Sequence, residues 1–212
     1  MHAVIPKIAP LTRVGATLVL VLVCASGRPG LAADGLEPIE VLRRNVTRAI
    51  AVLEDPRYGD PARRNAQRER LCDIAKEMFD PYLFSKLALA SSWERFSASE
   101  QEDFVQSFGS YLCRYYLTRL QQHYNDETVE FIGQEFKSSQ IATVEVVVQW
   151  QNTRVPVEIR MALREEHWKA YDIVLMGVSA VLVYRTQLDD ALRTGSPAQI
   201  IQSLREKTAF DG

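Results

Sequence analysis

The spacing of the apolar residues changes partway along this 212-residue chain, and that change limits the folds it can adopt. Up to about residue 124 the apolar residues recur every three or four positions, as on amphipathic helices. Apolar and polar residues then alternate in four segments, at about 128–137, 140–151, 154–165 and 167–176. After Gly177 the helical spacing returns. Helices, then an antiparallel meander, then further helices predict an α+β fold with a four-stranded sheet.

Local signals mark where the helices before the sheet begin. Pro38 opens the first apolar stripe, and proline is favoured in the first turn of a helix. Asp60 and Asp80 each precede a proline, a pairing typical of a capped helix start. Ser97 and Glu100 form a capping-box pattern ahead of the longest stripe. We therefore expect the first helices within 36–124, the sheet within 128–176 and the C-terminal helices within 178–208.

The first 33 residues have the pattern of a secretory signal peptide. Lys7 and Arg13 precede a charge-free apolar run over 14–25, and small residues follow up to Ala33. The run is shorter than the ~20 apolar residues of a transmembrane helix. We expect cleavage near Ala33, which leaves 34–212 as one exported domain; a retained anchor is the alternative.

Composition excludes some classes of function. Hydrophobic residues make up 47% of the chain, which is enough for a core and argues against disorder. The net charge is −2, and the first 33 residues hold three basic residues and no acidic ones, so the mature part is near −5. A general nucleic-acid binder would carry a basic surplus instead.

Two cysteines remain after removal of the signal peptide, Cys72 and Cys113, and both fall on predicted helices. Disulfides form and persist in the oxidising compartments that exported proteins reach. We expect a disulfide that ties two helices together, with a pair of buried free thiols as the alternative.

The sequence has no recognisable catalytic or metal-binding motif. It contains no phosphate-binding loop, dinucleotide fingerprint, paired C-x-x-C or nucleophile elbow. The three histidines, His2, His123 and His167, are scattered along the chain. We therefore expect no metal and no cofactor.

Two polar features have both a functional and a structural interpretation. Asp172 lies in a predicted strand and could carry a proton in a small cavity enzyme, or it could pair with an arginine on the outer face. The second predicted helix carries the one concentrated basic run, which could meet anionic headgroups or an acidic partner, or be a solvated helix start. For both features we favour the structural interpretation. The run consists of Arg63, Arg64, Arg68 and Arg70.

The most distinctive stretches lie around the last predicted strand and the helix after it. They are Trp168-Lys169-Ala170-Tyr171-Asp172-Ile173-Val174, Gly177-Val178-Ser179 and Tyr184-Arg185-Thr186-Gln187-Leu188. With these, the tail Ile200-Ile201-Gln202-Ser203-Leu204 and the segment Trp93-Glu94-Arg95-Phe96-Ser97, the chain closely resembles the MlaC family, also called toluene-tolerance auxiliary proteins. The resemblance covers most of the mature part.

This resemblance implies a periplasmic lipid carrier without enzymatic activity. Its fold would be a helical subdomain wrapped on a strongly curved four-stranded sheet, enclosing an apolar cavity for phospholipid tails. The implied partners are an inner-membrane ABC transporter with an MCE-domain ring and, in many systems, an outer-membrane lipoprotein or porin complex. A sister branch, HpnM, is expected to carry hopanoids. Leu175-Met176 and Val183 are more apolar than is usual in the family, which leaves a hopanoid ligand open.

Strand alternation gives the residues expected to line such a cavity. One face of each of the last three strands would point inward, and the long helix would form the facing wall. The expected lipid-binding residues are Phe104, Phe108, Tyr111, Leu112, Val144, Val146, Val148, Trp150, Val157, Ile159, Met161, Tyr171, Ile173 and Leu175. Two other functions stay open: a small cavity enzyme that uses Asp172, and a lipid-free scaffold of an envelope complex.

Overall fold

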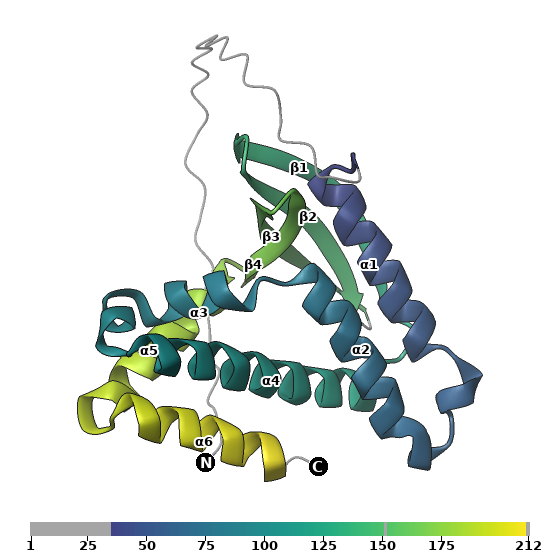
Figure 1. Ribbon diagram of the computed structural model, residues 1–212. Helices are drawn as coiled ribbons and strands as arrows, with labels where there is room; N and C mark the ends of the chain where they lie inside the picture. Colours follow the sequence, from purple (N-terminus) through teal and green to yellow (C-terminus); the bar gives the residue numbers. More distant parts are fainter. Residues whose placement is uncertain (1–34, 151, 211–212) are drawn as a thin grey trace, which may run out of the picture.

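The computed structural model describes residues 35–150 and 152–210, so the predicted signal peptide lies outside the described residues. The described part runs from helices through an antiparallel sheet to helices again (Figure 1), which confirms the predicted α+β class. No helix in these two ranges is long and apolar enough to cross a membrane.

The first two helices form a pair that is joined by short 3₁₀ turns. Helix α1 is Pro38–Leu53, the turns η1 and η2 are Pro56–Tyr58 and Pro61–Arg63, and α2 is Arg64–Met78. The Asp60 carboxylate accepts a hydrogen bond from the Ala62 backbone N–H at 2.9 Å, and this bond holds the second turn. The predicted Asp-Pro start therefore opens a 3₁₀ turn, and the α-helix begins three residues later.

The next two helices begin at the predicted caps. Helix α3 is Pro81–Leu89, and the Asp80 carboxylate accepts from the Leu83 N–H at 2.8 Å. After η3 (Ala90–Arg95), α4 is Ala98–His123. Both bonds of the Ser97–Glu100 capping box are present. The hydrogen bond that Glu100 accepts from the Ser97 backbone lowers the pKa of that carboxyl.

The sheet has five strands in sequence order, each antiparallel to the next. They are β1 (Thr128–Ser138), β2 (Ile141–Trp150), β3 (Thr153–Arg164), β4 (His167–Leu175) and β5 (Val178–Ser179). The fifth strand is missing from the sequence-based prediction because two residues are too few to show an alternation. It follows a tight turn in which Met176 and Gly177 have φ of 50° and 81°.

Two further helices follow the sheet, α5 (Ala180–Thr194) and α6 (Pro197–Phe210). Helix α6 runs beside α4 (Figure 1), where the Arg205 guanidinium bonds the Asp103 carboxylate at 2.7 Å. Helix α1 lies along β1 and β2 on the opposite side of the molecule.

The buried apolar residues form two cores. A helical core is built on α3 to α6 around Phe84, Phe104 and Phe108. A sheet core lies between α1 and strands β2 to β4. Phe79, between α2 and α3, packs against both cores. The backbone N–H of Asp80 donates to the Ala170 carbonyl at 2.8 Å, which ties the helical part to the edge of β4.

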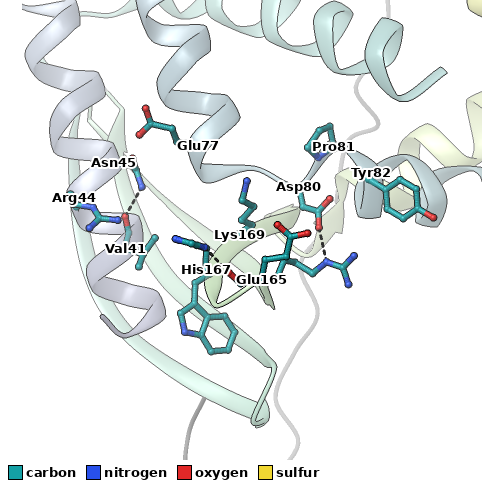
Figure 2. Close-up of a pocket in the computed structure, with 12 residues that line it drawn as sticks. Val41, Arg44, Asn45, Glu77, Asp80, Pro81, Tyr82, Glu165, His167 and Lys169 are labelled. Atoms are coloured by element: carbon teal, nitrogen blue, oxygen red, sulfur yellow. Dashed lines mark hydrogen bonds and ion pairs between the residues drawn. The ribbon is translucent and has the colours of Figure 1, made fainter. Parts of the chain in front are cut away.

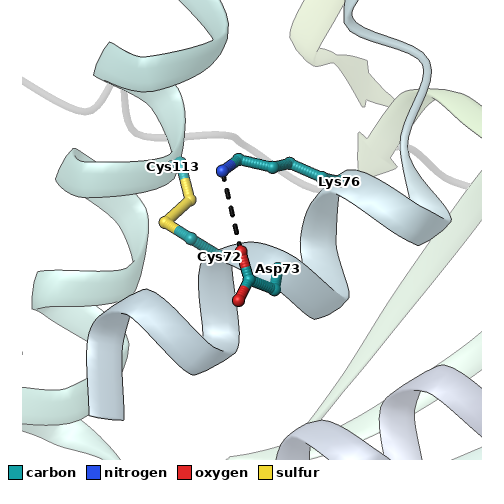
Figure 3. Close-up of a disulfide and its surroundings, with 4 residues drawn as sticks. All are labelled: Cys72, Asp73, Lys76 and Cys113. Carbon is teal, nitrogen blue, oxygen red and sulfur yellow. Dashed lines mark ion pairs between the residues drawn. A yellow bond between two sulfur atoms is a disulfide. The ribbon is translucent and has the colours of Figure 1, made fainter. Parts of the chain in front are cut away.

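A disulfide joins Cys72 of α2 to Cys113 of α4, with the two Cα atoms 5.9 Å apart (Figure 3). Asp73 and Lys76 form an ion pair next to it on α2. The bridge therefore connects the α1–α2 pair to the long helix of the helical core.

Candidate functional site

The candidate site is built on one face of the sheet, here called the inner face, which α1 covers at one end. The register places Val144 opposite Ile159 and Val146 opposite Val157, so the predicted faces of β2 and β3 coincide. Together with Met161 these residues are at most 8% exposed. They pack in the sheet core with residues of α1.

Strand β4 departs from simple alternation. Ala170 lies opposite Met161 and Asp172 lies opposite Arg160, so Tyr171 is an extra, bulged residue. A bulge shifts the alternation by one position. Trp168 and Ala170, which alternation predicts on the other face from Ile173, are thus buried on the inner face at 1% exposure each. Tyr171, which we expected on this face with Ile173 and Leu175, is instead the bulged residue and has no register partner on β3.

Beyond the bulge, the inner face is apolar and uncovered. Ile173 and Leu175 lie opposite Ile159 and Val157, yet they are 41% and 49% exposed. Val178, opposite Leu175, is 53% exposed. Trp150, which shares its face of β2 with Val146, is also 53% exposed, and Val148 is partly buried. We call Trp150, Ile173, Leu175 and Val178 the open end of the inner face.

Exposed apolar side chains continue into the start of α5. Six of the large apolar residues that are exposed lie within 173–183, where Met176, Leu182 and Val183 join three residues of the open end. Monomeric soluble proteins rarely expose such contiguous apolar surface unless it binds something. The composition of this segment therefore suits an apolar ligand.

The long helix does not provide the expected facing wall for these strands. Phe104 and Phe108 are 0% and 1% exposed, inside the helical core and not the sheet core. Leu112 packs against the same core, and the Tyr111 ring lies 6.0 Å from the Lys207 ammonium of α6. The structure therefore separates the predicted helix residues from the predicted strand residues.

Comparison with known proteins places this fold in a family. A family model described as MlaC protein matches residues 43–206, from α1 to α6. The chain belongs to the MlaC family. This membership confirms the resemblance based on the stretches around β4 and α5.

Further comparisons with this MlaC-family chain concern curated sequences and solved structures. A search of curated protein sequences finds no match. Among solved structures, a phospholipid-binding protein from Ralstonia solanacearum, determined in complex with a phospholipid, matches with a TM-score of 0.69 and 20% sequence identity. The match covers 83% of this chain and 99% of that chain. The two proteins therefore share a fold.

Asp172 of this MlaC-family chain anchors the start of α5. It is 2% exposed, and its oxygens accept hydrogen bonds from the Ser179 hydroxyl at 2.7 Å and the Val181 N–H at 3.0 Å. The Arg160 guanidinium lies 3.1 Å away. Ser179 also caps α5 by accepting from the Leu182 N–H. The carboxylate is thus held by contacts of the fold, in agreement with the structural interpretation of this acid.

Two residues of the distinctive stretch after Ser179 join α5 to other helices. The Tyr184 hydroxyl lies 3.0 Å from the Tyr116 hydroxyl of α4. Burial raises the pKa of Tyr184, so the phenol is neutral. The Arg185 guanidinium donates to the Leu87 carbonyl of α3 at 2.7 Å. Sequence reasoning missed Tyr116, which carries no motif signal of its own.

A polar cavity lies elsewhere in the molecule. It has a volume of about 600 Å³ between α1, the α2–α3 junction and the β3–β4 turn (Figure 2). Arg164 lies 3.3 Å from Asp80 there, and the His167 Nδ1 atom lies 2.7 Å from the Glu165 carbonyl. None of the predicted lipid-binding residues lines it. Among the described residues no cluster could hold a metal ion.

The arginines at the start of α2 lie at the surface, in agreement with the structural interpretation of this basic run. Arg63, Arg64 and Arg70 are exposed, and the Arg68 guanidinium donates to the Asn65 side chain at 2.6 Å. The structure therefore gives these side chains no common target.

Proposed function

We propose that this MlaC-family protein is a periplasmic carrier that covers the apolar part of a lipid and moves it between the inner and outer membranes. The observation that carries the proposal is the open end of the inner face. There Ile173 and Leu175 continue the apolar face of a packed sheet but are 41% and 49% exposed. Contact of such an apolar face with water is unfavourable in free energy, and binding of an apolar partner would relieve it.

The energetics of lipid transfer favour a binding protein with no catalytic group. Each methylene group moved out of water contributes ~0.8 kcal/mol, so one acyl chain approaches about 10 kcal/mol as an upper bound. That cost slows the escape of a free lipid through water. An apolar protein surface removes most of it, and the residues at the open end have the required chemistry.

We infer that the cargo is a phospholipid or a hopanoid. The phospholipid complex of the Ralstonia solanacearum protein, which has the same fold, favours the first. The apolar Leu175, Met176 and Val183 leave a rigid hopanoid ligand open. An MCE-type ABC transporter of the inner membrane would exchange the cargo, with an outer-membrane lipoprotein or porin complex as the second partner, and export would use the predicted signal peptide.

The first experiment is organic extraction and mass spectrometry of the protein isolated, without detergent, from the cell envelope. We expect near-stoichiometric phospholipid, or hopanoid if the chain belongs to the HpnM branch. Ile173→Arg should remove the lipid because a charge at the open end would have to be desolvated. Ile132→Arg is the matched control, since Ile132 is a strand residue that is 51% exposed outside the inner face.

Two outcomes would count against the carrier. If the protein is empty and also refuses lipid from phospholipid vesicles, the scaffold becomes the better explanation. If Ile173→Arg folds and retains full lipid, the open end is not where the lipid lies. A cavity enzyme that uses Asp172 has less support, because the fold already uses that carboxylate to hold Ser179 and Val181.

A further inference from the structure

The outer face of the sheet, opposite the inner face, carries an apolar groove that is distinct from the open end, although Val146 and Val157 of the inner face also border it. One-sided antiparallel sheets have polar residues on the face that meets water. Here Val147 lies directly opposite Pro156, and both line a groove of about 380 Å³. Ile132 and Met176 also line it, at 51% and 65% exposure.

Backbone irregularities bring both of these side chains to the groove. Phe131 lies opposite Val146 and Gly133 opposite Glu145, so Ile132 is an extra, bulged residue of β1. Met176 lies in the tight turn between β4 and β5. Bulges are common where a sheet re-aims a side chain for a function. An apolar outer face at this position is thus built by specific features of the chain.

Two carboxylates flank the groove without a counter-charge. Glu145 and Glu158 lie directly opposite each other, and like charges in that arrangement repel. Within the part of the chain that the structure describes, neither forms an ion pair or a hydrogen bond. The two arginines of the neighbouring outer-face positions are paired elsewhere, Arg154 with Glu130 at 2.7 Å and Arg160 with Asp172 at 3.1 Å. The groove therefore combines apolar walls with uncompensated negative charge.

We propose that this groove docks a basic, amphipathic segment of a partner protein. Apolar side chains of the segment would fill the space between Ile132 and Met176, and its lysines or arginines would face Glu145 and Glu158. Charge complementarity of this kind favours one class of partner and repels others. It disfavours an anionic membrane surface, because the two carboxylates would repel acidic headgroups.

The test uses protein isolated from the cell envelope and a fluorescently labelled 14-residue helical peptide of leucine and lysine. A matched peptide has glutamate in place of lysine. We expect the lysine peptide to bind at low salt and the glutamate peptide to fail. Glu145→Gln with Glu158→Gln should weaken binding about tenfold or more, because both counter-charges are lost. Titration should also shift the methyl NMR signals of Ile132 and Met176.

The matched control is Glu94→Gln with Glu102→Gln, which removes two exposed carboxylates from the helical part. The proposal is overturned if this control variant weakens binding of the lysine peptide as much as the Glu145→Gln, Glu158→Gln variant does. It is also overturned if the lysine and glutamate peptides bind equally. It is likewise overturned if vesicles of phosphatidylcholine and phosphatidylglycerol shift the Ile132 signal as the peptide does, which would indicate a membrane contact. Lipid content should stay unchanged in the groove variants, so failure here leaves the carrier proposal intact.

Discussion

The two ends of the inner face are made from the same kinds of residue and differ in what covers them. Near the β3–β4 turn, Met161 and Trp168 are 0% and 1% exposed, in a core completed by α1. At the opposite end, Leu175 and Val178 are 49% and 53% exposed. The inward-facing residues of the strands are equally apolar at both ends. Cover from α1, with Met78 and Phe79, makes one end a core, and the absence of such cover leaves the other end available to a ligand.

The largest effect is expected at the covered end. Trp168→Ala removes a fully buried indole and should lower the free energy of unfolding by about 3–5 kcal/mol, because the cavity cannot fully collapse. Urea denaturation followed by circular dichroism measures the loss. Trp150→Ala is the control at the open end. Because the Trp150 side chain is 53% exposed, its removal should lower the free energy of unfolding far less. Equal losses would mean that both ends are packed alike.

Removal of the disulfide tests whether the open end depends on the helical part. Cys72 and Cys113 are 41 residues apart, and replacing both by serine should cost about 2–4 kcal/mol, mainly through a less constrained unfolded chain. Lipid content should be unchanged because neither cysteine lies on the inner face. Denaturation midpoints and lipid mass spectrometry on the same sample separate the two effects. Loss of lipid from a folded variant would indicate that the α2–α4 link shapes the open end.

Asp172→Asn tests whether the carboxylate next to the open end has a structural role or a chemical one. Asparagine keeps one acceptor but loses the charge that Ser179 and Arg160 bond, so we expect a loss of about 1–3 kcal/mol in stability. A carrier should keep its lipid and its exchange with vesicles. A folded variant with normal lipid content but no function in cells would instead support a chemical role for the acid.

Much of the fold could be predicted from the sequence because its signals are local. The Ser97–Glu100 capping box and the four long strands are where the pattern places them, within one or two residues. The bulge at Tyr171 could not be predicted, since one inserted residue leaves no mark in an alternating pattern. It moved Trp168 and Ala170 to the inner face.

The site was harder to predict than the fold because it depends on which elements meet. Alternation indicates the face of Ile173 correctly but does not indicate where α1 stops covering it. The aromatic stripe of α4 identifies Phe104 and Phe108 as apolar surface, and only the packing of α3, α5 and α6 decides that they fill a separate core. Burial by a distant helix is a tertiary property that a periodic pattern does not contain.

The smallest effect on stability is expected from Leu175→Ser at the open end. Because Leu175 is 49% exposed, the substitution should change the free energy of unfolding by roughly 0.5 kcal/mol or less. Its effect on lipid should be much larger. Loss of contact with about two methylene groups corresponds to about 1.6 kcal/mol, or more than tenfold in affinity. Denaturation and lipid exchange with vesicles, measured on one preparation, give both numbers. A stability loss comparable to that of Trp168→Ala would mean that the open end is packed in solution, and the contrast between the two ends would then disappear.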